Sequence, residues 1–452
     1  MKANISRDEI LNGNIFKGII KLCLPLMLLN LINTLYGIVD TFFVGRIGEL
    51  QVGAVSLVSP ITNCGIAFST GLSVAGIAMI SRALGKDDYE KGRNIATHLL
   101  VLAVTLGLVI SIVCELFATS ILKWLNTPND IFVDTRNYFI GISLDYIPLF
   151  ILTIFQAIRQ SCGDTKSGAR LNIIASAINA LLDPLFIFVF KLGTLGAALA
   201  TVLSKCIMCP FALKSIFDET NPIYISLKEN RIEFNIMKKI VSVAIPASLG
   251  QLLSSFGFVL MSREIVSYGS IVMSGYGIGS NISNVFYIPV NSVGSALPTF
   301  IGQNLGAKNT ERARKCFSTA IKIVAVIALT VIALGFLTSR FIASLFVVNA
   351  SEQLISLSLE YAYFSEATAF FMGWFNCLCG VFDGSTNTKI SMILSTARLL
   401  VLRMPIVYLL ARFTNLQYTG IWISMILSNF LVCIIGQVIY FKYPWTEKYI
   451  NI

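Results

Sequence analysis

The sequence contains twelve apolar runs of about 20 residues each, separated by short polar segments. A run of that length crosses the hydrocarbon core of a bilayer when it is helical. The runs are much longer than barrel strands, and lipid does not tolerate unpaired backbone groups, so we predict helices. We therefore expect an all-α integral membrane protein with twelve transmembrane helices near residues 19–45, 54–80, 96–121, 139–158, 173–190, 197–212, 240–260, 271–300, 317–337, 361–380, 390–410 and 421–440.

The composition supports a membrane protein, because 55% of the 452 residues are apolar and 13% are charged. A soluble domain carries about 25% charged residues. The net charge of +10 does not indicate nucleic acid as a partner, because the basic residues lie in the gaps between apolar runs. The ten cysteines lie within or at the ends of these runs, which argues against a disulfide framework. Cys206 and Cys209 lack the second pair of a zinc site, so we expect no metal site there and no cofactor.

The positive residues are distributed unevenly between the two sides of the membrane. The segments after even-numbered spans carry 18 Lys and Arg, if Lys205 is counted with the segment that extends to Lys239, and the segments after odd-numbered spans carry 7. The positive-inside rule then places both termini in the cytoplasm. We expect a multi-pass protein of the plasma membrane.

The two halves of the chain match each other at one constant offset in the numbering, the offset that separates Pro25 from Pro246. Other pairs at this offset include Gly48 and Gly269, Glu90 and Glu311, Arg93 and Arg314, Gly163 and Gly384, and Pro184 and Pro405. Six spans are an even number of crossings, so both copies share one orientation. We predict an N-terminal six-helix lobe at residues 1–216, a cytoplasmic linker at 217–239 and a C-terminal six-helix lobe at 240–452. Two such bundles, related by a pseudo-twofold axis and facing each other across a cleft, are typical of alternating-access transporters.

Two acidic residues distinguish the copies. Asp40 and Asp183 lie within predicted spans, and the repeat places Met261 and Met404 at the corresponding positions. A charged residue at the centre of a membrane helix costs on the order of 3 kcal/mol, so it is a functional candidate by default. Counting about 1.5 Å per residue from the outer ends of the spans puts both aspartates and Thr201 at one depth, with Asn179 one turn deeper.

Polar residues at helical spacing form two stripes on these spans: Asn33, Tyr36 and Asp40 on the first, and Asn172, Ser176, Asn179 and Asp183 on the fifth. Either stripe lines a cavity or joins helices by hydrogen bonds. Two carboxylates in a shared dry pocket do not easily both ionise, so the pair is expected to hold a proton or a sodium ion. An organic cation that favours the ionised pair would compete with that ion, which is the physical basis of antiport.

These segments resemble the multidrug and toxic compound extrusion (MATE) family, and its DinF-like branch in particular. The resemblance covers nearly the whole chain. It is carried by LPLMLLNLINTLYGIVDTFFVGRIG in the first span, by NALLDP in the fifth, and by the paired loops LGKDDYEKGR and LGAKNTERAR. The family exports amphipathic organic cations by using a proton or sodium gradient. The resemblance implies an ion-coupling site at Tyr36, Asp40, Asn179, Asp183 and Thr201, with Tyr138 and Gln156 nearby.

Other polar residues are assigned by position. Pro25 and Pro246 each remove a backbone donor, so we expect a bend there, and the resemblance implies that the first span bends on protonation. Glu366 and Arg403 share a predicted depth, and we favour an ion pair between them. The predicted lining of the substrate cleft comprises Asn33, Asn172, Ser176, Tyr138, Gln156, Gln251, Asn281, Asn284 and Tyr287.

The sequence therefore predicts a monomeric antiporter of small organic cations, and not an enzyme. A flippase for lipids or lipid-linked precursors is the alternative, but it needs a cationic cleft, whereas the unmatched buried charges are acidic. An intramembrane aspartyl protease also uses two membrane aspartates. The contexts VD and LLDP differ from its YD and GxGD motifs.

Overall fold

The computed structural model describes residues 5–447 except 126, 227–232 and 347–350. The middle of the predicted linker and both ends of the chain thus lie outside the described residues. Within the described part, ten helices are long and apolar enough to cross a membrane, no strand occurs, and a pair of helices bent by 41° makes an eleventh candidate span. The prediction of an all-α, multi-pass membrane protein is confirmed.

The chain forms two compact units, which are described separately. Unit 1 is built mainly from Leu28–Ser248, and unit 2 combines Asp8–Met27 with the described residues from Leu249 onward. The long helices α2 (Ile15–Ile47) and α9 (Phe234–Val266) each contribute to both units. In both helices the division falls two residues after a proline, Pro25 or Pro246. The missing proline N–H weakens the helix there, so these positions are natural points for one helix to pass from one unit to the other.

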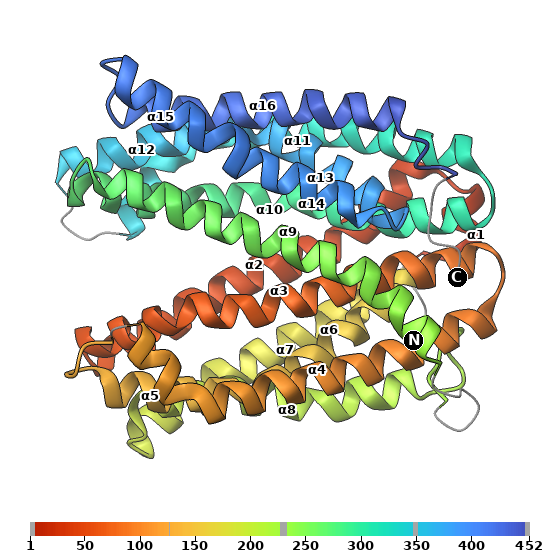
Figure 1. Ribbon diagram of the computed structural model, residues 1–452, viewed down its shortest axis with the longest axis horizontal. Helices are drawn as coiled ribbons and strands as arrows, with labels where there is room; N and C mark the ends of the chain where they lie inside the picture. Colours follow the sequence, from red (N-terminus) through yellow and green to blue (C-terminus); the bar gives the residue numbers. More distant parts are fainter. Residues whose placement is uncertain (1–4, 126, 227–232, 347–350, 448–452) are drawn as a thin grey trace. The chain divides into compact units, whose positions relative to one another are not determined.

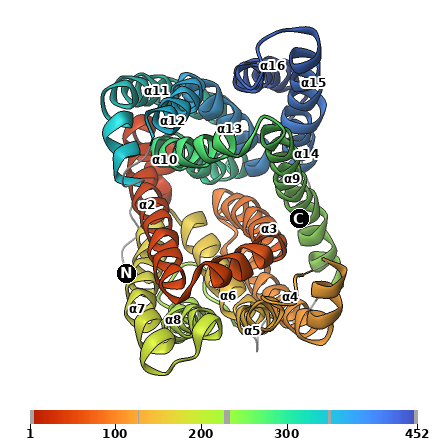
Figure 2. The same cartoon turned by 90° about the vertical axis from the view of Figure 1, so that its left-hand side faces the viewer.

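Unit 1 also contains α3 (Glu49–Gly85), α4 (Tyr89–Trp124), α5 (Phe132–Ser143), α6 (Tyr146–Ser161), α7 (Thr165–Pro184), the π-helical segment η1 (Leu185–Val189) and α8 (Gly193–Ile216). Helix α3 packs against α4, α5 and α6, and α8 packs against α5, α6 and α7. Figure 2 shows α7 and α8 side by side, in yellow and yellow-green.

Unit 2 contains α1 (Arg7–Asn12, from Asp8 onward), α10 (Ser270–Gly306), α11 (Thr310–Phe346), α12 (Glu352–Ala367), α13 (Ala369–Gly384), α14 (Thr388–Thr396), η2 (Ala397–Arg403), α15 (Met404–Phe413) and α16 (Thr419–Lys442) (Figure 1). Helix α10 packs against α11, α12 and α13, and α16 packs against α12, α13 and α14. The packing of unit 1 is therefore repeated helix for helix.

The repeat is also present in the backbone. Asp87 and Lys308 are equivalent positions of the repeat, and both have positive φ angles, 65° and 60°. Each follows a long helix and ends it in the left-handed conformation, which residues other than glycine rarely adopt. The π-helical segments are not equivalent positions of the repeat, because η1 begins directly after Pro184 and η2 ends at Arg403, two residues before Pro405. Pro405 has no N–H for the carbonyl of Val401, which accounts for an irregular turn in η2.

Two predicted spans are broken rather than continuous. The fourth, 139–158, divides between α5 and α6, and the tenth, 361–380, divides between α12 and α13 at Thr368. In the first case Pro148 lies at the third residue of α6 and has no N–H for the carbonyl of Leu144. In the second, the Tyr287 hydroxyl donates to the carbonyl of Ser365 at 2.7 Å and so binds the end of α12.

The part of the linker that is described is attached to unit 1. Arg159 donates to Asn221 at 2.6 Å, and the Arg93 guanidinium lies 4.1 Å from the ring centre of Tyr224. The imidazole of His98 accepts a hydrogen bond from the backbone N–H of Glu233 at 2.7 Å, just before α9 begins. These contacts fix the path of the linker on both sides of residues 227–232.

Candidate functional site

Thr201 joins three helices of unit 1. Its hydroxyl lies 3.0 Å from the hydroxyl of Tyr36 on α2 and accepts from the amide of Asn179 on α7 at 3.3 Å. The Thr201 hydroxyl also donates to the carbonyl of Ala197 on its own helix at 3.2 Å. Because a threonine has one hydroxyl proton, Tyr36 must be the donor in its bond to Thr201. The structure thus brings together three of the five residues predicted for the ion-coupling site.

The two aspartates lie at the same site. Asp183 is one turn after Asn179 on α7 and is completely buried. Asn179 is its neighbouring side-chain donor, but the Asn179 amide is bonded to Thr201, and neither carboxylate oxygen of Asp183 has a hydrogen bond of normal geometry among the described residues. Asp40, one turn after Tyr36 on α2, is half-buried and close enough to Asp183 for their charges to interact. An ionised carboxylate without donors is costly in a membrane protein, so this arrangement favours binding of a proton or a cation.

An ion pair that the sequence analysis missed borders these residues. Asp145 lies in the break between α5 and α6, is 6% exposed, and accepts from the Lys205 ammonium at 2.5 Å. Lys205 is one turn after Thr201 on α8, so both face the same way, and its charge also acts on Asp40. Counting Lys205 with a cytoplasmic segment was wrong, because Lys205 lies in the middle of α8 and pairs with the buried Asp145. The spacing from Thr201 to Lys205 was the signal available in the sequence.

Seven residues therefore form what we call the polar cluster of unit 1: Tyr36, Asp40, Asp145, Asn179, Asp183, Thr201 and Lys205. Tyr138 on α5 belongs beside it, because it lies within electrostatic range of all three aspartates. Its ring packs on the apolar residues Val44, Ile187 and Ala197.

Several predicted residues lie away from the polar cluster. Gln156 packs against Gly168, and the amide of Asn172 donates to the carbonyl of Gly168 at 3.1 Å. Gly168 precedes Asp183 by fifteen residues on α7, which corresponds to about 22 Å along the helix. Ser176 is half-buried between these two levels, and Asn33 is exposed on α2. In unit 2, exposed side chains are found at Gln251, Asn281 and Asn284.

The expected ion pair between Glu366 and Arg403 does not form in the described structure. Glu366 on α12 is completely buried and accepts from the hydroxyl of Ser339 at 2.8 Å. Arg403 donates to Ser428 at 3.0 Å and to Asn429 at 2.9 Å, both on α16. Two residues at the same depth form an ion pair only if their side chains face each other. Glu366 faces α11 and Arg403 faces α16, so the predicted pair was wrong.

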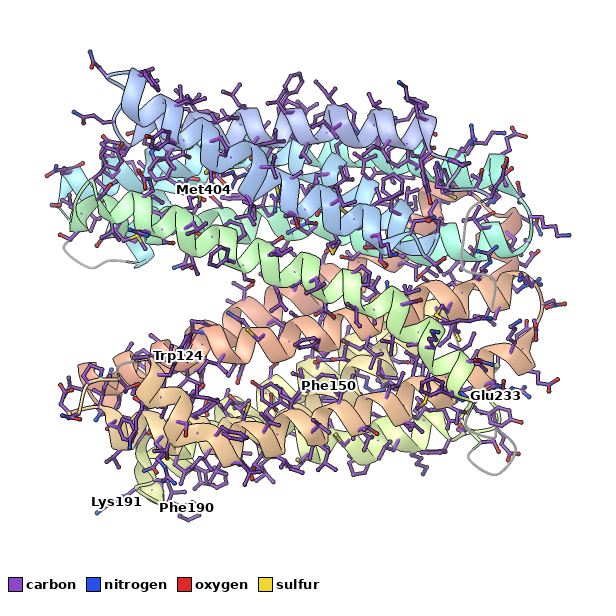
Figure 3. The ribbon with its side chains drawn as sticks, in the orientation of Figure 1. Trp124, Phe150, Phe190, Lys191, Glu233 and Met404 are labelled. Atoms are coloured by element: carbon purple, nitrogen blue, oxygen red, sulfur yellow. The ribbon has the colours of Figure 1, made fainter. Side chains whose placement is uncertain are left out.

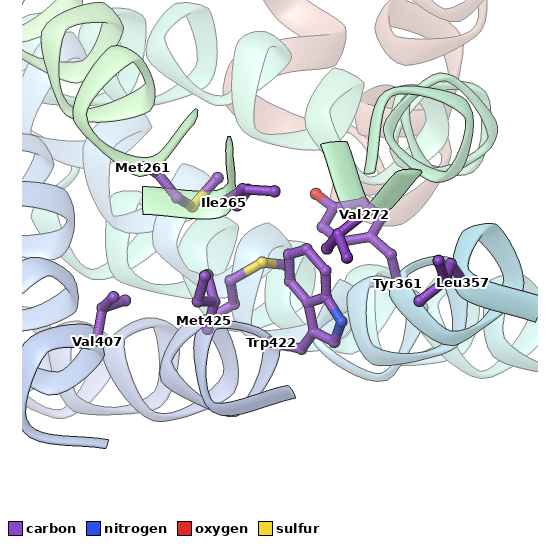
Figure 4. Packing of buried hydrophobic residues seen from close by; sticks show 9 residues of the cluster. Met261, Ile265, Val272, Leu357, Tyr361, Val407, Trp422 and Met425 are labelled. Carbon is purple, nitrogen blue, oxygen red and sulfur yellow. The ribbon is translucent and has the colours of Figure 1, made fainter. Parts of the chain in front are cut away.

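Apolar packing occupies the corresponding region of unit 2. Met261, the counterpart of Asp40, belongs to a buried cluster with Tyr361, Trp422 and Met425. Figure 4 shows the thioether of Met425 next to the Trp422 ring. Met404, the counterpart of Asp183, is half-buried on α15 (Figure 3). Carboxylates at these two positions are thus a property of unit 1, and the charged group beside Met261 in unit 2 is the guanidinium of Arg403, 3.9 Å from the sulfur of Met261.

Fold and site define a class: a helical membrane protein of two repeated units, one of which carries a buried group of acids. Comparisons with known proteins identify the family. The MatE family model matches residues 25–185 and 246–409, so its two matches begin at equivalent positions of the repeat, Pro25 and Pro246. The chain belongs to this family of membrane transporters, which are not enzymes.

Named relatives agree with the family assignment. The probable multidrug resistance protein YpnP of Bacillus subtilis (strain 168) is 27% identical over 317 residues, which cover 67% of this chain and 68% of the relative. The probable multidrug resistance protein NorM of Thermotoga maritima is 22% identical over 453 residues, 99% of this chain and 96% of the relative. A solved structure of a multidrug resistance MATE family transporter in the outward-facing conformation is 25% identical, with a TM-score of 0.91 over 97% of both chains.

Proposed function

We propose that the protein is a secondary active multidrug exporter that exchanges amphipathic organic cations for protons or sodium ions by alternating access. The carboxylates of Asp40 and Asp183 form its ion-coupling site, and the other members of the polar cluster bind and orient them. The family assignment and the names of the relatives, which are multidrug resistance proteins, support transport of drugs. The acidic cluster supports a positively charged substrate.

The observation that carries this proposal is the state of Asp183. Its carboxylate is buried, has no hydrogen bond of normal geometry among the described residues, and lies within electrostatic range of Asp40. A proton, a sodium ion or an organic cation each lowers the cost of burying these two acids. Because all three act on the same two carboxylates, the binding of one disfavours the others. That exclusion is sufficient to couple their movements in opposite directions.

The orientation of the protein follows from its charges. With Lys205 placed inside α8, the segments after even-numbered spans carry 17 Lys and Arg (18 − 1), against 7 after odd-numbered spans. We place both termini in the cytoplasm of the cell and the protein in the plasma membrane. In that orientation Asp40 and Asp183 lie in the outer half of the bilayer, where an inward gradient of protons or sodium can reach them. We expect the monomer to be the transporting unit.

The test is efflux of ethidium from lipid vesicles that contain the purified protein. A proton gradient and a sodium gradient are imposed separately. We expect one of them to drive efflux by the parent protein, and Asp40→Asn and Asp183→Asn to lose that gradient-driven efflux while remaining folded. Glu115→Gln is the matched control, because Glu115 is an acid in a span of unit 1 that is exposed on α4 and outside the polar cluster. It is expected to transport as well as the parent.

Two outcomes contradict the proposal. If both aspartate variants transport as well as the parent, the coupling site is elsewhere. If neither gradient drives ethidium efflux but the vesicles translocate a lipid with an anionic head group, the protein is a flippase.

A further inference from the structure

An acid at a helix break is present in both units. Asp145 and Glu366 are equivalent positions of the repeat, and each lies where a predicted span divides into two helices. Both side chains are buried, with exposures of 6% and 0%. Their partners differ, however: Asp145 pairs with the ammonium of Lys205, whereas Glu366 accepts from the neutral hydroxyl of Ser339. The acid is common to both copies, but within the described part of the chain it pairs with a cation only in unit 1.

The sequence register shows what replaces the lysine. Three additional residues precede α16 in the second copy, so Gly196, Leu203 and Ser204 of α8 match Gly420, Leu427 and Ser428. In this register Lys205 falls on Asn429, an uncharged residue. The unit that keeps the lysine is thus the same unit that keeps Asp40 and Asp183.

Unit 2 also shows how close the positions equivalent to Lys205 and Asp40 are to each other. One guanidinium group, that of Arg403, donates to Asn429 at 2.9 Å and lies 3.9 Å from the sulfur of Met261. Asn429 is the counterpart of Lys205, and Met261 is the counterpart of Asp40. Because the two units share their helix packing, the positions of Lys205 and Asp40 are separated by about the width of one side chain.

The contacts of unit 1 agree with this distance. Lys205 lies one turn after Thr201, which bonds to Tyr36, and Tyr36 lies one turn before Asp40. The titratable groups within electrostatic range of the lysine are Asp145 at the α5–α6 break, Asp40 on α2, and Cys206 and Cys209 on α8. A lysine ammonium on a flexible four-carbon chain can move between two acceptors of this kind.

We propose that Lys205 is a tethered cation that moves between Asp145 and Asp40, and so competes with the exported cation for the ion-coupling site. This inference rests on the proposed function. While Lys205 is paired with Asp145, the carboxylates of Asp40 and Asp183 are available to an organic cation. When that cation leaves, Lys205 moves to Asp40, and a proton from water neutralises Asp145. Asp145 is then a second place where the coupling proton binds.

The inference predicts opposite effects for the two members of the ion pair. Lys205→Met removes the competing cation, so ethidium should bind more tightly, by about tenfold. Asp145→Asn releases Lys205 to Asp40, so ethidium should bind more weakly, by about tenfold. In the double variant no competing cation remains, so it should bind ethidium as tightly as Lys205→Met does, to within about threefold. The measurement is the equilibrium affinity of the purified full-length protein for ethidium, at one fixed pH and ionic strength.

A purely structural ion pair would give a different result. It would tie α8 to the α5–α6 break, so losing either member would change the ethidium affinity in the same direction. Shifts of the same sign, or no shift in either variant, would therefore overturn the inference. Lys205→Gln keeps a donor for Asp145 without the charge and should tighten binding as the methionine does, which provides a second variant if the first does not fold.

Two controls separate this inference from the proposed function. Lys214→Met removes an exposed positive charge from the same helix and should leave the affinity unchanged. The double substitution Asp40→Asn with Asp183→Asn should abolish ethidium binding. If this double variant still binds ethidium, both the proposed function and the inference fail. If the double variant loses ethidium binding but Asp145→Asn and Lys205→Met shift the affinity in the same direction, only the inference fails.

Discussion

Thr201→Val tests whether the hydrogen bonds at Thr201 hold α2, α7 and α8 together. The substitution keeps the shape of the side chain and removes the acceptor of the bonds from Tyr36 and Asn179. Asn179 is 1% exposed, so its amide cannot turn to water. Hydrogen bonds between membrane helices contribute about 0.6 kcal/mol each on average, with a maximum of about 1.7 kcal/mol. We therefore expect Thr201→Val to lower the free energy of unfolding by about 1–3 kcal/mol.

The assay is equilibrium unfolding in mixed micelles, followed by the helical circular dichroism signal. Thr201→Ser is the matched control, because it keeps the hydroxyl and loses one methyl group, at a cost of about 0.8 kcal/mol. A double-mutant cycle with Tyr36→Phe isolates the Tyr36 bond, for which we expect a coupling of about 0.6–1.7 kcal/mol. If the effects of Thr201→Val and Tyr36→Phe add to within about 0.3 kcal/mol, the bond does not contribute and the reasoning is refuted.

Two further substitutions test contacts outside the polar cluster by the same unfolding assay. Gly335→Ala places a methyl group against the buried carboxylate of Glu366 and should lower the free energy of unfolding by about 1–3 kcal/mol. Gly277→Ala is the control, because Gly277 has open space around it, and it should lower the free energy of unfolding much less. Equal losses in the two variants would contradict the packing of α11 on α12. Asp164→Asn leaves the buried charge of Arg159 without the carboxylate that lies 2.7 Å away, and should lower the free energy of unfolding by about 3–5 kcal/mol. Glu219→Gln, at an exposed position, is the control and should leave the stability unchanged. A loss below about 1 kcal/mol for Asp164→Asn would show that the ion pair is solvated.

The spans were predictable from the sequence, because the length of an apolar run reports directly on the thickness of the bilayer. Hydrophobicity alone does not predict the two breaks, because it is the same in a straight helix and in a bent one. Pro148 was a local signal for the first break. At the second break the end of α12 is bonded by Tyr287, which is 78 residues from its partner Ser365, and no local pattern reports such a contact.

The site was predictable where residues share one helix, and less so where they come from different helices. Spacing along α2 and α7 placed Tyr36 with Asp40 and Asn179 with Asp183, because the period of one helix fixes which side chains share a face. Depth counting does not give the rotation of one helix relative to another. That is why Glu366 and Arg403, at equal depth, bond to different helices.

The comparison of the two copies bears on whether the polar residues of unit 1 serve only to join helices. Unit 2 packs the equivalent helices against one another with methionines at the positions of Asp40 and Thr201, Met261 and Met425, around the ring of Trp422. Apolar contacts, together with the hydrogen bonds from Arg403 to Ser428 and Asn429, thus hold these helices together without the two carboxylates of unit 1. If the aspartates of unit 1 were only structural, the chain would bear the cost of burying them without need, since the second copy has methionine at both equivalent positions, Met261 and Met404. The cost is explained if the acids bind something that the second copy does not, and a small cation is the ligand that two buried carboxylates favour.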